Sequence, residues 1–110
     1  MKNTILCLLL SSVCIVAEAR NPELKFNADG RFRILQLTDL HLTADNTEAE
    51  VSTLARIRFE VETEKPDLIA VTGDVISNGG KCRDVFVRFL DALESLEVPF
   101  CFVFGNHDQE

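Results

Sequence analysis

The sequence contains no run of basic residues, and its charge balance is acidic. Its 110 residues include 11 Lys and Arg against 18 Asp and Glu, which gives a formal net charge of −7. Proteins that bind nucleic acids through their phosphates need clustered positive charge, so nucleic-acid binding is not expected. A bound metal would instead have to attract any anionic substrate.

Apolar runs of membrane-spanning length are also absent after the N-terminus. Residues 1–19 combine one lysine, a short apolar run, and alanines at positions 17 and 19, which fit a cleavage site before Arg20. An N-terminal anchor is the alternative, but the run is short for a span of about 20 residues. We expect a signal peptide over residues 1–19, and hence a secreted protein or one in the secretory, lysosomal or vacuolar lumen. We expect no stable membrane span after cleavage.

Modifications typical of secreted proteins can be checked against the sequence. No Asn-x-Ser/Thr sequon occurs, so N-glycosylation is not expected. Cys82 and Cys101 are the cysteines outside the expected signal peptide. An oxidising compartment permits a disulfide between them, and the alternative is two separate small core residues. The sequence leaves both possibilities open.

After a polar lead-in segment, residues 20–31, apolar runs of two kinds alternate. Short runs rich in strand-forming residues occupy positions 32–38, 67–74 and 98–104, and helical spacing occupies positions 47–64 and 81–97. The middle apolar run does not alternate with polar residues, which predicts a strand buried on both faces. The order strand, helix, strand, helix, strand predicts an α/β fold with a largely parallel sheet, right-handed crossovers and helices packed on it.

The ends of the first predicted helix carry recognisable signals. Thr47 followed by Glu50 predicts a capping box at its start, and Pro66 closes it. The apolar face expected to meet the sheet comprises Val51, Leu54, Arg58 (through its aliphatic stem) and Val61, with Ile57 beside them.

Polar residues follow each of the three predicted strands. Asp39 and His41 follow the first, Gly73-Asp74 the second, and Gly105-Asn106-His107-Asp108 the third. Because the carboxyl ends of parallel strands meet at one edge of a sheet, these side chains are expected to converge there. Carboxylate, imidazole and amide donors together suit divalent Zn, Mn or Fe. The glycines permit sharp turns that direct the next side chain over the edge.

Each motif alone has an ordinary structural explanation. An Asp-x-His triplet is common in loops, Gly-Asp after a strand is most often a turn, and Gly-Asn-His-Asp can be a turn with a capping aspartate. Their occurrence after three successive strands of one sheet favours a shared site.

Together, "LQLTDLHL", "PDLIAVTGDVISNGG" and "VPFCFVFGNHD" resemble the first three sequence blocks of the calcineurin-like metallophosphoesterases. The secretory signal and the last block are most similar to the purple-acid-phosphatase-like branch. The resemblance covers residues 32–110. It implies that these residues form the N-terminal βαβαβ half of an α/β/β/α sandwich, and that the substrate is a phosphate ester.

The resemblance also implies a site with two divalent metal ions, Mn, Zn or Fe. Asp39 and His41 would bind the first ion, Asp74 would bridge both, and Asn106 would bind the second. His107 would be the catalytic histidine, which stabilises charge on the phosphoryl group or protonates the leaving oxygen; the alternative is a structural histidine. Asp108 would fix the turn rather than bind metal.

The sequence departs from the family pattern at Ser77. Purple acid phosphatases have a tyrosine iron ligand three residues after the bridging aspartate, whereas this chain has no tyrosine. A purple iron(III) centre is therefore not expected. Phosphoprotein phosphatases carry an aspartate at the same place to orient the catalytic histidine, and Ser77 cannot supply that charge to His107.

The histidine ligands of the family's second half have no counterpart, because His41 and His107 are the only histidines. We therefore expect a fragment of a metal-dependent phosphoesterase that binds metal weakly by itself. It would expose an edge strand and an apolar face. The alternatives are a catalytically inactive truncated product, or a metal-free α/β binding module with an anion site at a helix end. The sequence indicates neither the exact substrate nor the oligomeric state.

Overall fold

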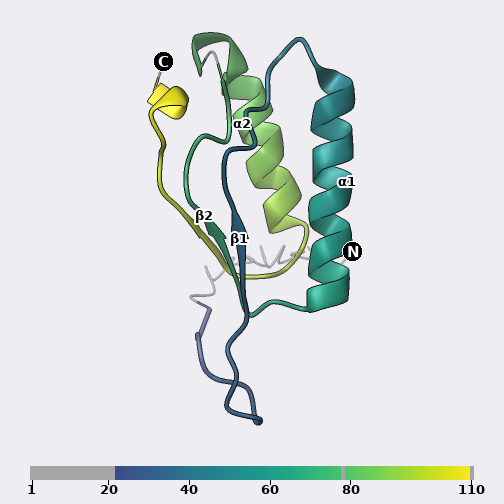
Figure 1. Ribbon diagram of the computed structural model, residues 1–110, viewed down its shortest axis with the longest axis vertical. Helices are drawn as coiled ribbons and strands as arrows, with labels where there is room; N and C mark the ends of the chain where they lie inside the picture. Colours follow the sequence, from purple (N-terminus) through teal and green to yellow (C-terminus); the bar gives the residue numbers. More distant parts are fainter. Residues whose placement is uncertain (1–21, 78, 110) are drawn as a thin grey trace, which may run out of the picture.

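A computed structural model describes residues 22–77 and 79–109 of the chain. The elements follow the order β1, α1, β2, α2, β3 and a short 3-10 helix, η1 (Figure 1). Their bounds are Ile34–Leu37 for β1, Thr47–Glu64 for α1, Leu68–Val71 for β2, Gly79–Glu94 for α2, Phe100–Phe102 for β3 and His107–Gln109 for η1. The expected signal peptide, residues 1–19, lies outside the described residues.

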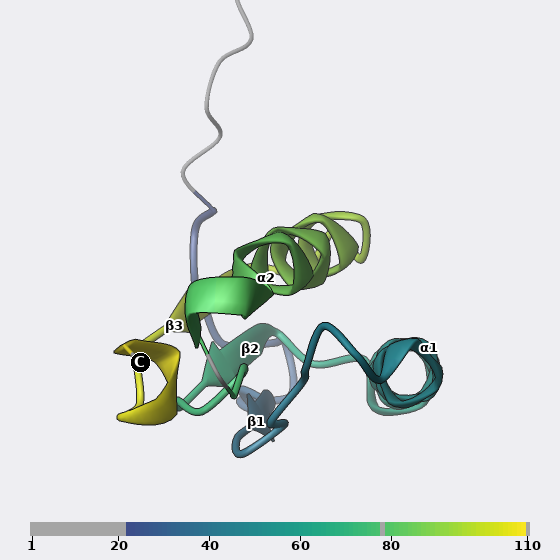
Figure 2. The ribbon, with the colours of Figure 1, turned by 90° about the horizontal axis from the view of Figure 1, so that it is seen from above.

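The three strands form a parallel sheet in the order β1-β2-β3, as the alternating pattern predicts. Ile34 pairs with Leu68, and Ile69 pairs with Phe100. All three strands run upward in Figure 1, so their carboxyl ends meet at the upper edge of the sheet, where η1 also lies. Figure 2 shows both helices on one side of the sheet, as expected for two successive crossovers of one hand.

The prediction that β2 is buried on both faces is wrong. Ile69 and Val71 are buried, whereas Leu68 and Ala70 between them are only partly buried. The reason is that α1 and α2 cover the same side of the sheet, and no helix or strand among the described residues covers the other side (Figure 2). On the uncovered side Ile34 is 58% exposed. The expectation of an exposed apolar face is thus met within the described residues.

The core lies between the covered side of the sheet and the helices. Strand residues contribute alternate side chains, and α2 contributes residues at helical spacing. Its members are Leu37, Leu42, Ile57, Val61, Ile69, Val71, Val75, Ile76, Cys82, Val85, Phe89 and Leu93.

The start and the apolar face of α1 differ from prediction. The N-cap is Asn46, whose side-chain oxygen accepts a hydrogen bond from the Ala49 N–H at 3.1 Å. Thr47 is the first helical residue, so the predicted capping box does not form. Val51 is 62% exposed, because the helix turns Glu50, rather than Val51, toward α2.

The end of each helix is marked by a residue in the left-handed region. Lys65, with φ 46°, caps α1 just before Pro66, and its N–H donates to the Val61 carbonyl at 2.9 Å. Glu97, with φ 56°, lies in the turn after α2. That helix ends at Glu94, three residues earlier than predicted.

Cys82 and Cys101 are both free, so the disulfide between them that the sequence left open does not form. Cys82 is buried in the helix-covered core, whereas Cys101 is exposed on β3. No helix within residues 22–77 and 79–109 combines the length and apolarity needed to cross a bilayer.

A salt bridge joins the two helices. The guanidinium of Arg88 donates from Nε and one Nη to the two oxygens of Glu50, each at 2.7 Å. Glu50 is 5% exposed, so its charge would be costly without this partner. The hydrogen bonds from Arg88 lower the pKa of Glu50 below its ordinary value, against the opposing effect of burial.

Replacing Arg88 by methionine is expected to change how stability depends on pH. Because the folded-state pKa of Glu50 is lowered, the bridge stabilises the wild type fully above about pH 4.5 and is lost as the pH falls through the folded pKa. Without Arg88, burial raises the pKa of Glu50, so the carboxylate opposes folding at neutral pH. Urea unfolding should give a much lower free energy of unfolding for Arg88→Met than for the wild type at pH 7. At pH 3.5 this difference should be smaller.

Arg56→Met is the matched control for this prediction. Arg56 pairs with Glu60 on the same helix, and its side chain is 72% exposed. Exposed pairs contribute about 0–1 kcal/mol, so this variant should remain close to wild type at both pH values. If Arg88→Met lowered the free energy of unfolding equally at both pH values, the charge of Glu50 would not be the cause of the loss.

Candidate metal centre

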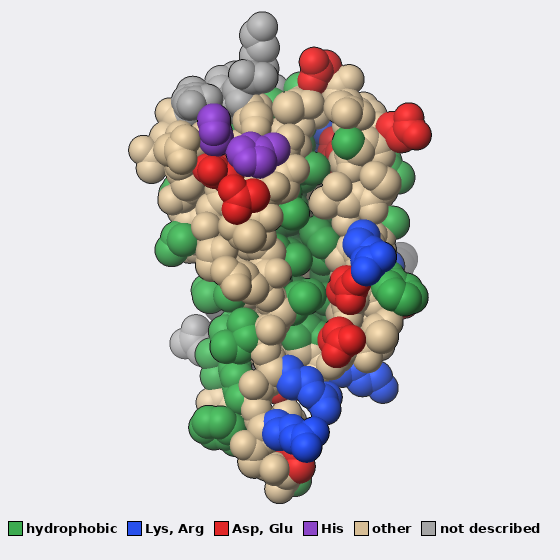
Figure 3. Space-filling view, viewed as in Figure 1, with side chains coloured by type: hydrophobic (Ala, Val, Ile, Leu, Met, Phe, Trp, Pro, Cys, Tyr) green, Lys and Arg blue, Asp and Glu red, His purple; other side chains and the backbone are tan. Residues whose placement is uncertain are grey.

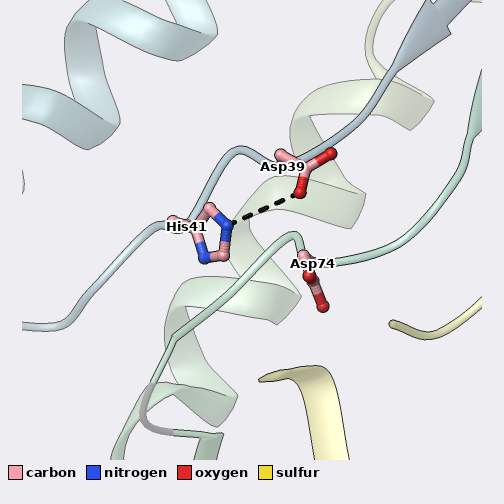
Figure 4. Close-up of side chains that lie close together, drawn as sticks. All are labelled: Asp39, His41 and Asp74. Atoms are coloured by element: carbon pink, nitrogen blue, oxygen red, sulfur yellow. Dashed lines mark ion pairs between the residues drawn. The ribbon is translucent and has the colours of Figure 1, made fainter. Parts of the chain in front are cut away.

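The polar residues predicted at the strand ends gather at the carboxyl edge of the sheet. In Figure 3, acidic side chains lie exposed beside the histidines at one end of the molecule. The loop after β1 carries Asp39 and His41, and the loop after β2 carries Asp74 (Figure 4). One donor atom from each of these three residues lies within 4.8 Å of the others.

The backbone of both loops is held in a conformation that is uncommon outside glycine. Asp39, His41 and Asp74 have φ values of 53°, 47° and 53°. The loops are joined by backbone hydrogen bonds, from the Asp39 N–H to the Gly73 carbonyl at 3.1 Å and from the His41 N–H to the Asp74 carbonyl at 3.0 Å. Strained backbone conformations cluster at functional sites, where surrounding contacts maintain them.

Asp39 and His41 face each other across the first loop. Oδ1 of Asp39 lies 3.7 Å from Nε2 of His41. Oδ2 of Asp39 accepts a hydrogen bond from the Thr38 hydroxyl at 2.6 Å. Both side chains are open to solvent, at 62% exposure for Asp39 and 41% for His41, so a cation can reach them directly.

Asp74 rests in a cradle formed by the loop after β3. Its Oδ1 accepts a hydrogen bond from the His107 N–H at 3.0 Å. A Cβ atom at Gly105 would lie 2.0 Å from that oxygen and 2.5 Å from the Asp74 nitrogen. The glycine before Asn106 is therefore needed for close approach between the two loops, rather than only for a sharp turn.

Asp108 ties the second and third loops together. Its Oδ2 accepts hydrogen bonds from the N–H groups of Asp74 and Gly105, each at 2.8 Å, and its Oδ1 accepts one from Ile76 at 3.0 Å. The carboxylate thus connects strand ends that are 34 residues apart in sequence. These contacts agree with the expectation that Asp108 fixes the turn.

His107 and Asn106 lie at the same edge of the sheet. The rings of His107 and His41 are in edge contact, with centroids 5.1 Å apart. Asn106 is exposed between β3 and η1, and its carbonyl accepts a hydrogen bond from the Gln109 N–H at 3.4 Å. The catalytic role of His107 and the metal-binding role of Asn106 remain predictions.

Ser77 contacts a residue that the sequence analysis did not connect to it. Its hydroxyl oxygen lies 2.8 Å from Nδ1 of His41. From the sequence, this position is notable only for the tyrosine or aspartate that it lacks. The contact depends on how the first two loops pair, which no local sequence signal reveals.

The donor set fits a divalent cation. Metal–ligand distances for histidine and carboxylate are about 2.0–2.2 Å, so two donors on one ion lie up to about 4.4 Å apart. The donors of Asp39, His41 and Asp74 lie within 4.8 Å of one another, which a small side-chain rotation would bring into range. Mixed carboxylate and imidazole donors suit divalent transition-metal ions, and the identity of the metal, Zn, Mn or Fe, stays a prediction.

Comparison with known proteins agrees with the geometry. The family model for the calcineurin-like phosphoesterases matches residues 32–110. A relative from Arabidopsis thaliana, named probable inactive purple acid phosphatase 14, is 35% identical over 105 residues, which cover 80% of this chain and 26% of the relative. The chain thus spans about a quarter of that relative's length.

Relatives from other kingdoms also match much of the chain. The phosphatase DCR2 of Saccharomyces cerevisiae is 30% identical over 74% of this chain and 17% of its own. A probable cyclic nucleotide phosphodiesterase of Moraxella catarrhalis is 36% identical over 70% of this chain and 27% of its own.

A solved structure shares the fold. The crystal structure of a dimetal phosphatase from Danio rerio superposes with a TM-score of 0.54 at 19% identity, over 70% of this chain and 30% of that one. At this identity the likeness concerns the fold alone. The parallel βαβαβ arrangement with its acidic carboxyl edge and the family match to residues 32–110 lead to the same conclusion: the chain belongs to the calcineurin-like phosphoesterase family.

Proposed function

We propose that this protein is a metal-dependent phosphoesterase in which residues 32–110 form the N-terminal part of the catalytic domain. The observation that carries the proposal is the convergence of donor atoms from Asp39, His41 and Asp74 within 4.8 Å at the carboxyl edge of the sheet. Membership of the calcineurin-like phosphoesterase family supports phosphate esters as the substrate class.

The residues divide into distinct tasks in this proposal. Asp39 and His41 hold the first cation. Asp74, oriented by the His107 N–H, is shared with a second cation, to which Asn106 contributes its amide oxygen. His107, whose ring contacts that of His41, would stabilise charge on the phosphoryl group or donate a proton to the leaving oxygen.

The cations, Mn, Zn or Fe, would supply an activated water and would stabilise charge on the phosphate oxygens. The chain's own contribution is to fix the donors in place. Hydrogen bonds from backbone amides to Asp74 and Asp108 hold the second and third loops, so that little reorganisation is needed when ligands bind.

A catalytically inactive metal-binding protein is the second candidate. It is favoured by the names of two plant relatives, both called probable inactive purple acid phosphatases. The signal-peptide prediction places either candidate in the secretory pathway.

Metal analysis and phosphoesterase assays of the purified chain test this proposal. We expect binding of Mn²⁺ or Zn²⁺ by calorimetry. Because the chain spans only part of its relatives, we expect slow hydrolysis of p-nitrophenyl phosphate or its bis-ester, which EDTA abolishes and added metal restores. Metal binding without turnover would support the inactive candidate. Absence of metal binding would overturn both and favour a metal-free binding module.

A further inference from the structure

The imidazole of His41 is engaged on both sides. Nδ1 lies 2.8 Å from the Ser77 hydroxyl oxygen, which is hydrogen-bonding distance. Nε2, on the opposite edge of the ring, points toward Asp39 Oδ1 at 3.7 Å (Figure 4). The nitrogen directed at the other donors of the metal centre is therefore Nε2.

The backbone of Ser77 is held in place on both sides of the residue. The Ser77 N–H donates to the Leu42 carbonyl at 3.0 Å, and the Ser77 carbonyl accepts from the Cys82 thiol at 3.0 Å. Leu42 also forms a parallel bridge with Ile76. These contacts hold the second loop against the first and keep the short Ser77 side chain within hydrogen-bonding distance of Nδ1.

The chemistry of a neutral imidazole explains what this contact can do. One ring nitrogen carries the proton and the other carries the lone pair that binds metal. A hydrogen bond from Nδ1–H to an outer acceptor places the lone pair on Nε2 and fixes the plane of the ring. A serine hydroxyl can accept such a bond, because its oxygen has two lone pairs.

We propose that Ser77 is a positioning residue for the metal centre: its hydroxyl oxygen accepts a hydrogen bond from Nδ1–H of His41 and so presents Nε2 to the cation. This inference rests on the proposed function. It also gives a role to the position at which the sequence departs from the purple acid phosphatases. Here the residue at that position acts through His41 rather than binding the metal itself.

Ser77→Ala is the central variant in the test, with calorimetric titration of Zn²⁺ into the purified chain. Loss of a hydrogen-bonding partner of a metal ligand typically weakens binding by about 10–100-fold, and we expect about 10-fold for this neutral partner. Ser77→Thr keeps the hydroxyl and should restore affinity. Ser52→Ala, which removes an exposed hydroxyl bonded only to the Ala49 carbonyl of its own helix, is the matched control and should match wild type.

A second readout does not depend on affinity or activity. Long-range ¹H–¹⁵N spectra of the zinc-loaded chain should show His41 with a protonated Nδ1 and a metal-bound Nε2. In Ser77→Ala the Nδ1 signal should shift or broaden, because the outer acceptor is lost.

The outcomes separate the inference from the proposed function. Zinc binding by the wild type with equal affinity for Ser77→Ala would overturn the inference and leave the proposed function standing. Coordination of zinc through Nδ1 of His41 would likewise overturn the inference and leave the proposed function standing. A wild type that binds no metal would overturn both.

Discussion

Replacing Asp74 by asparagine is expected to weaken divalent-metal binding by about 100-fold or more while the fold remains intact. Removing a ligand should cost more than the 10–100-fold that is typical of removing a ligand's hydrogen-bonding partner. Asparagine keeps an oxygen that can accept the His107 N–H, the contact that Oδ1 of Asp74 makes at 3.0 Å. The side chain can therefore keep its place while the negative charge is lost.

This prediction is checked by calorimetric titration with Mn²⁺ or Zn²⁺, and by circular dichroism to confirm the fold. Asp91→Asn removes one exposed charge on α2 and should leave affinity unchanged, which controls for the general loss of acidity. Near-wild-type affinity in Asp74→Asn would show that this carboxylate is not a ligand, and the proposed sharing of Asp74 between two cations would be wrong.

Replacing Asp108 by alanine is expected to lower the free energy of unfolding by about 3 kcal/mol or more. Hydrogen bonds to charged groups contribute about 1.5–3 kcal/mol each, and the effects of neighbouring bonds are not additive. The Asp108 carboxylate accepts three, from the backbone N–H groups of Asp74, Ile76 and Gly105. Without it, these amides lose their partner and the ends of β2 and β3 separate.

Urea unfolding in the presence of EDTA measures this effect without any metal contribution. Asp29→Ala is a suitable control, because the exposed Asp29 carboxylate accepts a single backbone hydrogen bond, from Arg31 at 3.1 Å. Asp29→Ala should lower the free energy of unfolding by about 0.5–1.5 kcal/mol at most. If Asp108→Ala unfolds like wild type in EDTA and loses only metal-dependent stability, Asp108 is a ligand and its structural role is refuted.

The secondary structure and its order could be predicted because they depend on local signals. The periodicity of residues 47–64 matches the observed bounds of α1, and three apolar runs became three parallel strands. The convergence of Asp39, His41 and Asp74 could also be predicted from the order of strands and helices along the chain, since the carboxyl ends of parallel strands lie at one edge of the sheet.

Details that depend on contacts between distant residues were missed. Glu50 was assigned to a capping box, yet it pairs with Arg88, 38 residues away, and Asn46 caps the helix instead. The second strand was expected to be buried on both faces, but both helices cover one side of the sheet. The Glu50–Arg88 pair and the one-sided cover of the sheet have no local sequence signal, because each depends on which side of the sheet a crossover takes. The Asn46 cap does have one, since asparagine is a preferred N-cap residue and its contact with Ala49 spans three residues.

The sequence by itself determined the α/β pattern, the family resemblance and which donor residues follow each strand, because these depend on neighbours along the chain. Only the tertiary structure decided how the donors are held. It placed Asp74 in the cradle at Gly105, joined two loops through the Asp108 carboxylate, and set Ser77 against Nδ1 of His41. These contacts link residues more than 30 positions apart, and they form only when the paired strands bring the loops together.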